Sequence, residues 1–175
     1  MNTPSRLRCI VLEDEDPLRR DLLRYLSRFE EVEIIGEAVS VNEAYRLISE
    51  KKPDSAFMDI KLIGGDIFYL LERLKQNAIP IPNIIVTTGF PEYVMTAIND
   101  YHNHIVQYLV KPYKDMGEEK LRKAVDALIA AKSKKDTHSN TAANSSHIFV
   151  PSRRNLVRID FDRVIYLEVA GSGST

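Results

Sequence analysis

A chain of 175 residues with 44% hydrophobic and 28% charged residues can form one globular domain and a smaller appendage. Its net charge of −1, from 24 basic and 25 acidic residues, gives no overall reason to bind nucleic acid or an anionic membrane. The single cysteine, Cys9, excludes an internal disulfide framework, and no apolar run approaches the roughly 20 residues that span a bilayer. We therefore expect a cytoplasmic protein.

Apolar, β-branched runs alternate with amphipathic stretches along most of the chain. The runs predict five strands, over residues 7–12, 32–38, 55–59, 83–88 and 105–110. The amphipathic stretches predict five helices, over residues 17–29, 40–52, 66–76, 91–101 and 118–132. Five strand-then-helix units in succession predict a parallel sheet with helices on both faces. The expected fold class is α/β, a doubly wound, flavodoxin-like fold with strand order 2-1-3-4-5.

The composition changes near residue 131, where we place the end of a first domain that begins at residue 5. Residues 132–146 contain no large apolar side chain and are expected to form a flexible linker. Residues 147–175 return to strand-type patterning, but they are too few to bury a core of their own.

Charged and hydroxyl side chains stand at or just after the ends of four predicted strands. In strand order they are Glu13 and Asp14, Asp59, Thr88, and Lys111. The second strand ends in GEAVS, and we expect no charge from it at this place. Ligands of open α/β sheets bind outside the carboxyl ends of the strands, and strands 1 and 3 are neighbours in the expected order. Three carboxylates should therefore meet there.

This set of groups is suited to phosphoryl transfer. Carboxylates that meet raise one another's pKa unless a cation joins them, and oxygen ligands suit Mg²⁺. The Lys111 ammonium and the Thr88 hydroxyl would contact further phosphoryl oxygens. Phosphoryl transfer needs mainly positioning and charge neutralisation, and a carboxylate can be the nucleophile. Asp59 is therefore predicted to accept a phosphoryl group, with Mg²⁺ as cofactor.

Each of these residues also has a purely structural interpretation. An acidic pair such as Glu13 and Asp14 is more often a solvated strand end than a metal site. Asp59 could cap the following segment, and Tyr108 could be a packing residue of a strand. Only the combination of the acidic pair with Asp59 and Lys111 favours a metal site.

Five motifs in this order resemble the signature of bacterial two-component response regulator receiver domains over roughly residues 5–134. The motifs are Glu13-Asp14, Asp59, Thr88-Gly89, Tyr108 and Lys111-Pro112. Thr88 is chosen over the adjacent Thr87 because a small residue, Gly89, follows it. The sequence departs from the family pattern after Asp59, where Ile63 and Ile67 replace the usual Pro and Gly. We expect Gly64 and Gly65 to supply the flexibility of that loop.

The resemblance implies roles for these residues. The implied Mg²⁺ ligands are Glu13, Asp14, Asp59 and the backbone carbonyl of Lys61. The implied phosphate-binding and switch residues are Thr88, Gly89, Lys111 and the aromatic Tyr108. The Lys111–Pro112 bond is expected to be cis. The implied partners are a sensor histidine kinase and a second copy of the chain, which would form a homodimer through the fourth helix, fifth strand and fifth helix.

The end of the chain, residues 148–171, resembles the start of a LytTR-type DNA-binding domain. That family's module is several times longer, so the chain is interpreted as truncated within its second domain. DNA binding is expected only in the complete protein.

The leading hypothesis is therefore a phosphoacceptor signalling domain, not an enzyme, that controls transcription in the complete protein. The alternative is a receiver-like interaction module that is not phosphorylated. A Mg²⁺-dependent phosphatase is disfavoured, because it would need a second acid near Asp59 and the position two residues later is Lys61.

Overall fold

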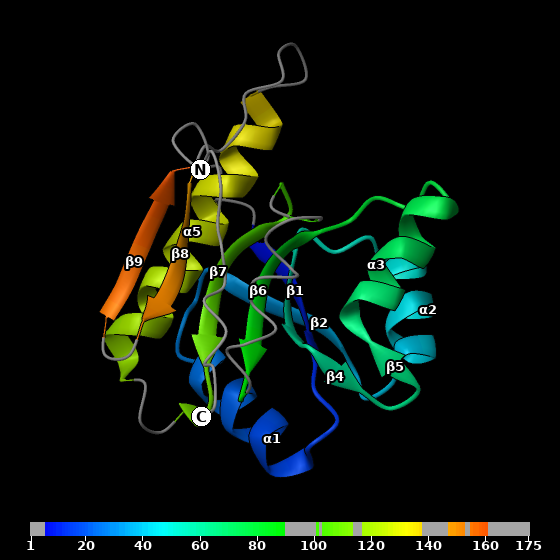
Figure 1. Cartoon of the computed structure of the whole chain (residues 1–175), viewed down its shortest axis with the longest axis horizontal. Coiled ribbons are helices and arrows are strands. Elements are labelled where there is room, and N and C mark those ends of the chain that lie inside the picture. The colour runs from blue at the N-terminus through cyan, green and yellow to red at the C-terminus, as the bar shows by residue number, and fades with distance from the viewer. Residues whose placement is uncertain are drawn as a thin grey trace, which may run out of the picture.

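The structure is a computed structural model that describes residues 6–89, 101, 103–113, 117–137, 147–152 and 155–160. Its centre is a five-stranded parallel sheet (Figure 1). The strands are β1 (Leu7–Leu12), β2 (Val32–Ala38), β3 (Ser55–Asp59), β6 (Asn83–Thr88) and β7 (Ile105–Val110). Their order is β2-β1-β3-β6-β7. Because β6 and β7 are the fourth and fifth strands of this sheet, the predicted order and all five strand ranges are confirmed.

Helices cover both faces of the sheet. Those in the described ranges are α1 (Asp16–Leu26), α2 (Val41–Lys51), α3 (Ile67–Gln76) and α5 (Glu118–Thr137). The helix predicted over residues 91–101 lies outside the described residues except for Tyr101, which is helical. Helix α5 continues to Thr137, past the expected domain end at residue 131.

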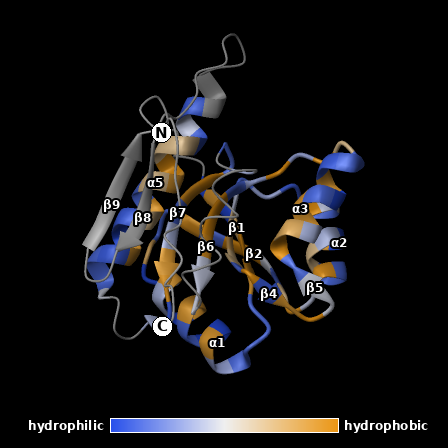
Figure 2. Ribbon diagram, viewed as in Figure 1, coloured by the Kyte–Doolittle hydropathy of each residue, from blue (hydrophilic) through white to orange (hydrophobic). Residues whose placement is uncertain are grey.

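Alternation along the strands divides the core into two layers, one on each face of the sheet. The layer beneath α2 and α3 includes Ile10, Met58, Val86, Ile48 and Leu70. The layer beneath α1 and α5 includes Val11, Phe57, Ile85, Leu22 and Val125. Figure 2 shows β1 and β6 as hydrophobic strands between the helices. Strands that are buried on both faces are expected to be apolar throughout, which explains why the sequence runs were easy to recognise.

Two helix starts are fixed by side-chain caps. The Ser40 side chain accepts a hydrogen bond from the Glu43 backbone N–H (3.3 Å), and the Glu43 carboxylate accepts one from the Val39 N–H (3.0 Å). This resembles a capping box, except that the reciprocal bond comes from Val39, the residue before the cap. At the start of α3 the Asp66 carboxylate accepts from the Tyr69 N–H (2.9 Å). The predicted starts of these two helices therefore agree with the structure to within one residue.

The loop after β3 has structure that was not predicted. Lys61–Leu62 (β4) and Gly65–Asp66 (β5) pair as a short antiparallel ribbon. Ile63 and Gly64 form its turn, and Gly64 and the following Gly65, the first residue of β5, have φ values of 86° and 149°, in the region that favours glycine. The Ile63 backbone is hydrogen-bonded on both sides to the connection between β2 and α2. The two glycines, which were expected to supply flexibility, lie in the turn and at the start of β5, in a ribbon that these backbone hydrogen bonds tie to the neighbouring connection.

Residues beyond α5 form an antiparallel hairpin of β8 (His147–Ser152) and β9 (Asn155–Asp160). Strand β8 lies next to β7, the edge strand of the main sheet. Among the described helices, none is long and apolar enough to cross a membrane.

Candidate metal centre

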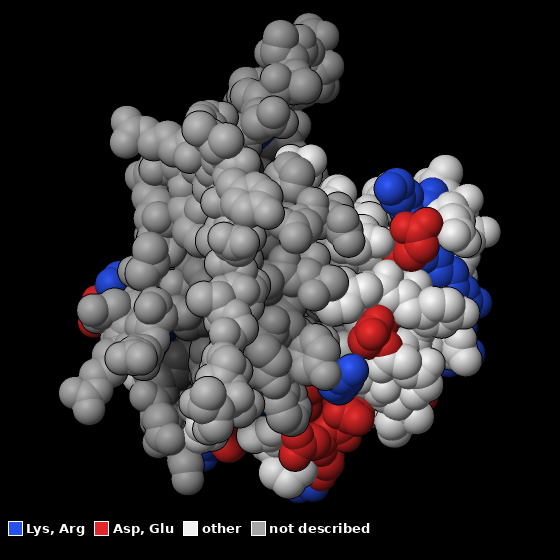
Figure 3. All heavy atoms as spheres, viewed as in Figure 1, with Lys and Arg blue, Asp and Glu red and all other residues white. Residues whose placement is uncertain are grey.

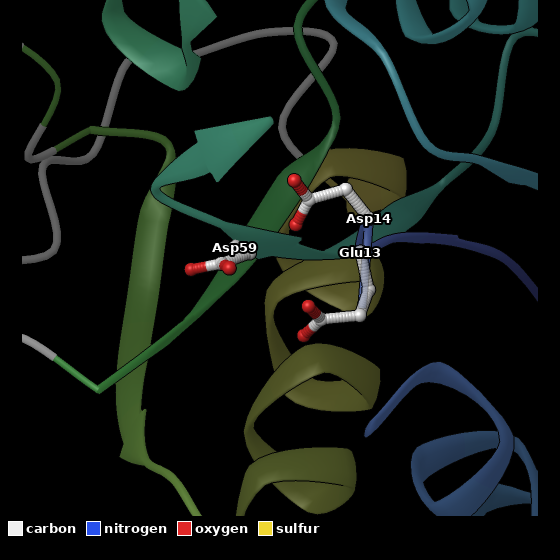
Figure 4. Close-up of side chains that lie close together, drawn as sticks. All are labelled: Glu13, Asp14 and Asp59. Carbon is white, nitrogen blue, oxygen red and sulfur yellow. The ribbon is translucent and has the colours of Figure 1, made fainter. Parts of the chain in front are cut away.

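Three carboxylates converge at the carboxyl edge of the sheet. One oxygen each of Glu13, Asp14 and Asp59 lies within 4.8 Å of the others. Parallel pairing of Leu12 with Met58 brings the ends of β1 and β3 together, and each acidic side chain follows directly. Figure 4 shows Glu13 and Asp14 extending from the end of β1 on the side where Asp59 lies. Glu13 and Asp59 are buried, whereas Asp14 is partly exposed.

The Lys111 ammonium stands between two of these carboxylates. Its Nζ lies 2.6 Å from Glu13 Oε2 and 2.6 Å from Asp59 Oδ2, and only 8% of the side chain is exposed. The Lys111 backbone N–H donates to the Thr88 carbonyl oxygen (3.0 Å), which ties it to the end of β6. The Lys111–Pro112 peptide bond is cis, as the family resemblance implied.

Burial and ion pairing act in opposite directions on this group of charges. Burial raises the pKa of Glu13, and the Lys111 ammonium offsets only part of that rise. Burial alone would lower the pKa of Lys111, but its contacts with Asp59 and Glu13 outweigh this and raise it. The Lys111 ammonium thus pairs with two of the three carboxylates, and Asp14 forms no ion pair among the described residues. A hard divalent cation would fit this surplus of negative oxygen donors.

The two adjacent threonines at the end of β6 face opposite sides of the sheet. Val86 pairs with Tyr108 in the β6–β7 register, and both side chains belong to the core layer beneath α2 and α3. Thr88, two residues after Val86, is on the same face as Tyr108 because strand side chains alternate. Thr87 is therefore on the face covered by α1 and α5. This placement supports Thr88 as the partner of Tyr108, a choice that the sequence based only on Gly89.

The structure does not test the predicted roles of two other site residues, Lys61 and Gly89. Lys61 is exposed and lies in β4, two residues after Asp59. Gly89 is exposed directly after β6, and a Cβ added to it would meet none of the described atoms within 4 Å. The metal-binding role of the Lys61 carbonyl and the phosphate-binding role of Gly89 stay predictions.

Sequence reasoning missed two residues that contact Glu13. Tyr113, 5% exposed, donates a hydrogen bond from its hydroxyl to Glu13 Oε2 (3.3 Å). Arg19 of α1 donates to the Glu13 backbone carbonyl (3.0 Å) and to the Glu37 carboxylate (3.2 Å). Glu37 of β2 thus contacts the acidic loop through Arg19, but it is not one of the three clustered carboxylates, which agrees with the expectation that the second strand brings no charge to them. The only sequence signal for Tyr113 was its position directly after Pro112.

Comparison with known proteins places this geometry in context. Residues 9–126 match the family described as the response regulator receiver domain. The chain is 29% identical over 163 residues to the sensory transduction protein LytT of Bacillus anthracis, which covers 90% of this chain and 64% of the relative. It is 30% identical over 159 residues to the transcriptional regulatory protein BtsR of Salmonella typhi, which covers 86% of this chain and 62% of the relative. The chain thus spans less than two thirds of the length of these curated relatives.

Solved structures show the same fold. The signal receiver domain of an HD domain-containing protein from Pseudomonas fluorescens aligns with a TM-score of 0.64 at 23% identity, covering 78% of this chain and 96% of that one. The response regulatory domain of the Klebsiella pneumoniae protein mrkE aligns with a TM-score of 0.61 at 23% identity, covering 73% and 98%. At this identity the similarity is one of fold alone.

Proposed function

Because this chain belongs to the response regulator receiver domain family, a family of signalling domains, we propose that it accepts a phosphoryl group on Asp59 in a Mg²⁺-dependent reaction. The observation that carries this proposal is the placement of three carboxylates within 4.8 Å of one another. The Lys111 ammonium lies 2.6 Å from two of them. The chain itself acts as a phosphoacceptor and not as an enzyme with a separate substrate.

The nucleophile is the Asp59 carboxylate. Oδ2 is held by Lys111, and the other oxygen accepts no hydrogen bond from the described residues, so it is the one that attacks phosphorus. The phosphoryl donor is a phosphohistidine of a sensor histidine kinase. The P–N bond breaks with its electron pair remaining on the imidazole nitrogen, and a P–O bond to Asp59 forms. The product is an acyl phosphate.

The residues around Asp59 stabilise the transferred group. Bound by Glu13, Asp14, Asp59 and the Lys61 carbonyl, Mg²⁺ would neutralise charge on the phosphoryl oxygens. Lys111 moves from the Asp59 carboxylate to a phosphoryl oxygen, which needs little displacement because its Nζ already lies at Asp59. The Thr88 hydroxyl donates to another oxygen, and its movement changes the packing of Tyr108 on the same face of the sheet.

This change in packing is the output signal. Strand β7, which carries Tyr108, is the edge strand of the sheet, and α5 packs against it. We place a phosphorylation-dependent homodimer on this face, with the fourth helix as its third element; strand β8, which lies next to β7, would have to move away for the dimer to form. One relative is named a transcriptional regulatory protein and another LytT, and residues 148–171 resemble the start of a LytTR-type domain; together these support transcriptional control through such a domain as the output of the complete protein.

The test is intact-mass measurement after incubation with acetyl phosphate and Mg²⁺. Wild-type protein should gain the mass of one phosphoryl group, and Asp59→Asn should gain none. Asp21→Asn is a matched control, because Asp21 is an exposed carboxylate of α1 that pairs only with Arg24 among the described residues. It should be phosphorylated like wild type. Addition to Asp59→Asn would show that the acceptor is another residue.

Two further arms separate the remaining explanations. Chelation of Mg²⁺ with EDTA should abolish the mass gain in the wild type. A folded wild-type protein that gains no mass from acetyl phosphate or from a phosphorylated kinase would instead support an interaction module that works without phosphorylation.

A further inference from the structure

Arg19 connects the acidic loop between β1 and α1 to two neighbouring elements. Its guanidinium donates to the Glu13 backbone carbonyl (3.0 Å), to Asp16 Oδ1 (2.6 Å) and to Glu37 Oε2 (3.2 Å). Only 15% of the side chain is exposed. These partners belong to the end of β1, the first turn of α1 and strand β2. One side chain therefore holds three segments together beside the carboxylates.

We propose that Arg19 is a positioning residue for the cation site: it fixes the loop in the conformation that directs Glu13 and Asp14 toward Asp59. The Glu13 carbonyl belongs to the peptide unit that joins Glu13 to Asp14. Because that unit is planar, a hydrogen bond to its oxygen restricts the orientation of both residues at once. This inference rests on the proposed function, since it concerns the affinity of the same site for Mg²⁺.

The geometry requires arginine and not merely a positive charge. The guanidinium is a planar fork whose separate N–H groups can donate to several acceptors in fixed directions. Arg19 uses Nε, Nη1 and Nη2 for its three partners. A lysine has one ammonium nitrogen on a flexible stem, so it cannot hold Glu37 of β2 and the Glu13 carbonyl with the same geometry.

The charge of Arg19 alone predicts the opposite effect on metal binding. A cation beside a Mg²⁺ site repels Mg²⁺, so removing the charge should tighten binding if charge is all that matters. Figure 3 shows acidic side chains gathered beside α1 at the lower edge of the molecule. If Arg19 served only to neutralise these carboxylates, it would lower the affinity of the neighbouring site for Mg²⁺. Positioning and charge can therefore be distinguished by the sign of the change.

The neighbouring Arg20 is a matched control. It carries the same charge on the same turn of α1, its side chain is 75% exposed, and among the described residues it pairs only with Asp16. No hydrogen bond or ion pair joins it to Glu13 or Glu37. Arg20→Gln therefore removes one charge from this helix end without removing the contacts of the loop.

The experiment measures Mg²⁺ affinity by isothermal titration calorimetry on the whole chain, with circular dichroism as a check of folding. Arg19→Gln should bind Mg²⁺ about tenfold more weakly than wild type, the effect expected when a residue that orients a ligand is lost. Arg20→Gln should change the affinity by no more than about twofold, as for other exposed charges. Arg19→Lys, which keeps the charge, should also bind more weakly than wild type.

The outcomes separate this inference from the proposed function. If wild-type protein binds no Mg²⁺, the proposed function fails. If wild type binds Mg²⁺ but Arg19→Gln binds as tightly as Arg20→Gln or more tightly, only the role of Arg19 is overturned. Should Arg19→Gln fail to fold, Arg19→Lys decides, and wild-type affinity in that variant overturns the inference.

Discussion

Two buried tyrosines near the candidate site should respond in opposite directions when each loses its hydroxyl. The Tyr108 side chain is 1% exposed, and its hydroxyl has no hydrogen-bond partner among the described residues. Tyr113 is 5% exposed, but its hydroxyl donates to Glu13 (3.3 Å). Burial raises the pKa of both tyrosines, so both hydroxyls are protonated at neutral pH. We predict that Tyr108→Phe stabilises the protein and that Tyr113→Phe destabilises it.

The expected size follows from the cost of an unpaired polar group. A buried hydroxyl without a partner costs about 1–3 kcal/mol, and removing it leaves a small void that takes back part of the gain. Tyr108→Phe should therefore raise the free energy of unfolding by about 1 kcal/mol. Tyr113→Phe loses one hydrogen bond to a carboxylate at a long distance, and should lower it by about 1 kcal/mol. The two variants should differ by about 2 kcal/mol, or roughly 6 °C in melting temperature.

Urea unfolding followed by circular dichroism, at neutral pH and without Mg²⁺, measures both changes. The dependence of free energy on urea concentration should be the same in the two variants and wild type, so that shifts in midpoint report stability. A loss of stability in Tyr108→Phe as large as that in Tyr113→Phe would refute the reasoning. It would mean that the Tyr108 hydroxyl has a hydrogen-bond partner in the folded protein.

Three further predictions concern the charges of the site. Lys111→Met leaves the Glu13 and Asp59 carboxylates without their shared ammonium, and should lower the free energy of unfolding by about 3 kcal/mol in urea titrations; an unchanged midpoint would contradict it. Mg²⁺ at 100 times its dissociation constant should stabilise wild type by about 2.7 kcal/mol in thermal melts, and Asp14→Asn should lose most of this gain. Burial raises the pKa of Glu13 above its ordinary value of 4.5, so the metal-free native state binds the extra proton. Stability should therefore fall as pH rises from 4.5 through the raised pKa, and an equal fall in Glu13→Gln would show that Glu13 is not the cause.

The sheet could be predicted from the sequence because its strands are buried on both faces. Each appears as a short continuous apolar run, and each ends near a charged or hydroxyl residue. The starts of α2 and α3 were predictable because their caps, Ser40 with Glu43 and Asp66, are local in sequence. The parallel order then brought Glu13, Asp14 and Asp59 together without further information.

The remaining features depend on contacts that no local pattern shows. The β4–β5 ribbon has two residues in each strand, and its geometry depends on positive φ angles at Gly64 in the turn and at Gly65, the first residue of β5. Such a short pairing has no hydrophobic period to recognise. The contacts of Arg19 and Tyr113 with Glu13 depend on how helix α1 and the segment after β7 pack on the sheet. From the sequence alone, Arg19 could equally be a solvated residue of a surface helix, and Tyr113 a loop residue with no contact to the site.

Lys111 connects the acceptor chemistry of the proposed function to the strand that carries Tyr108. Its ammonium lies 2.6 Å from both Glu13 and Asp59, and its backbone N–H donates to the Thr88 carbonyl at the end of β6. Lys111 also follows directly after β7. Under the proposed function, a phosphoryl group on Asp59 would move negative charge outward from the buried carboxylate, and Lys111 would divide its contacts between Glu13 and the new oxygens. A change of charge on Asp59 would therefore act first on Lys111, and through it on the ends of both β6 and β7.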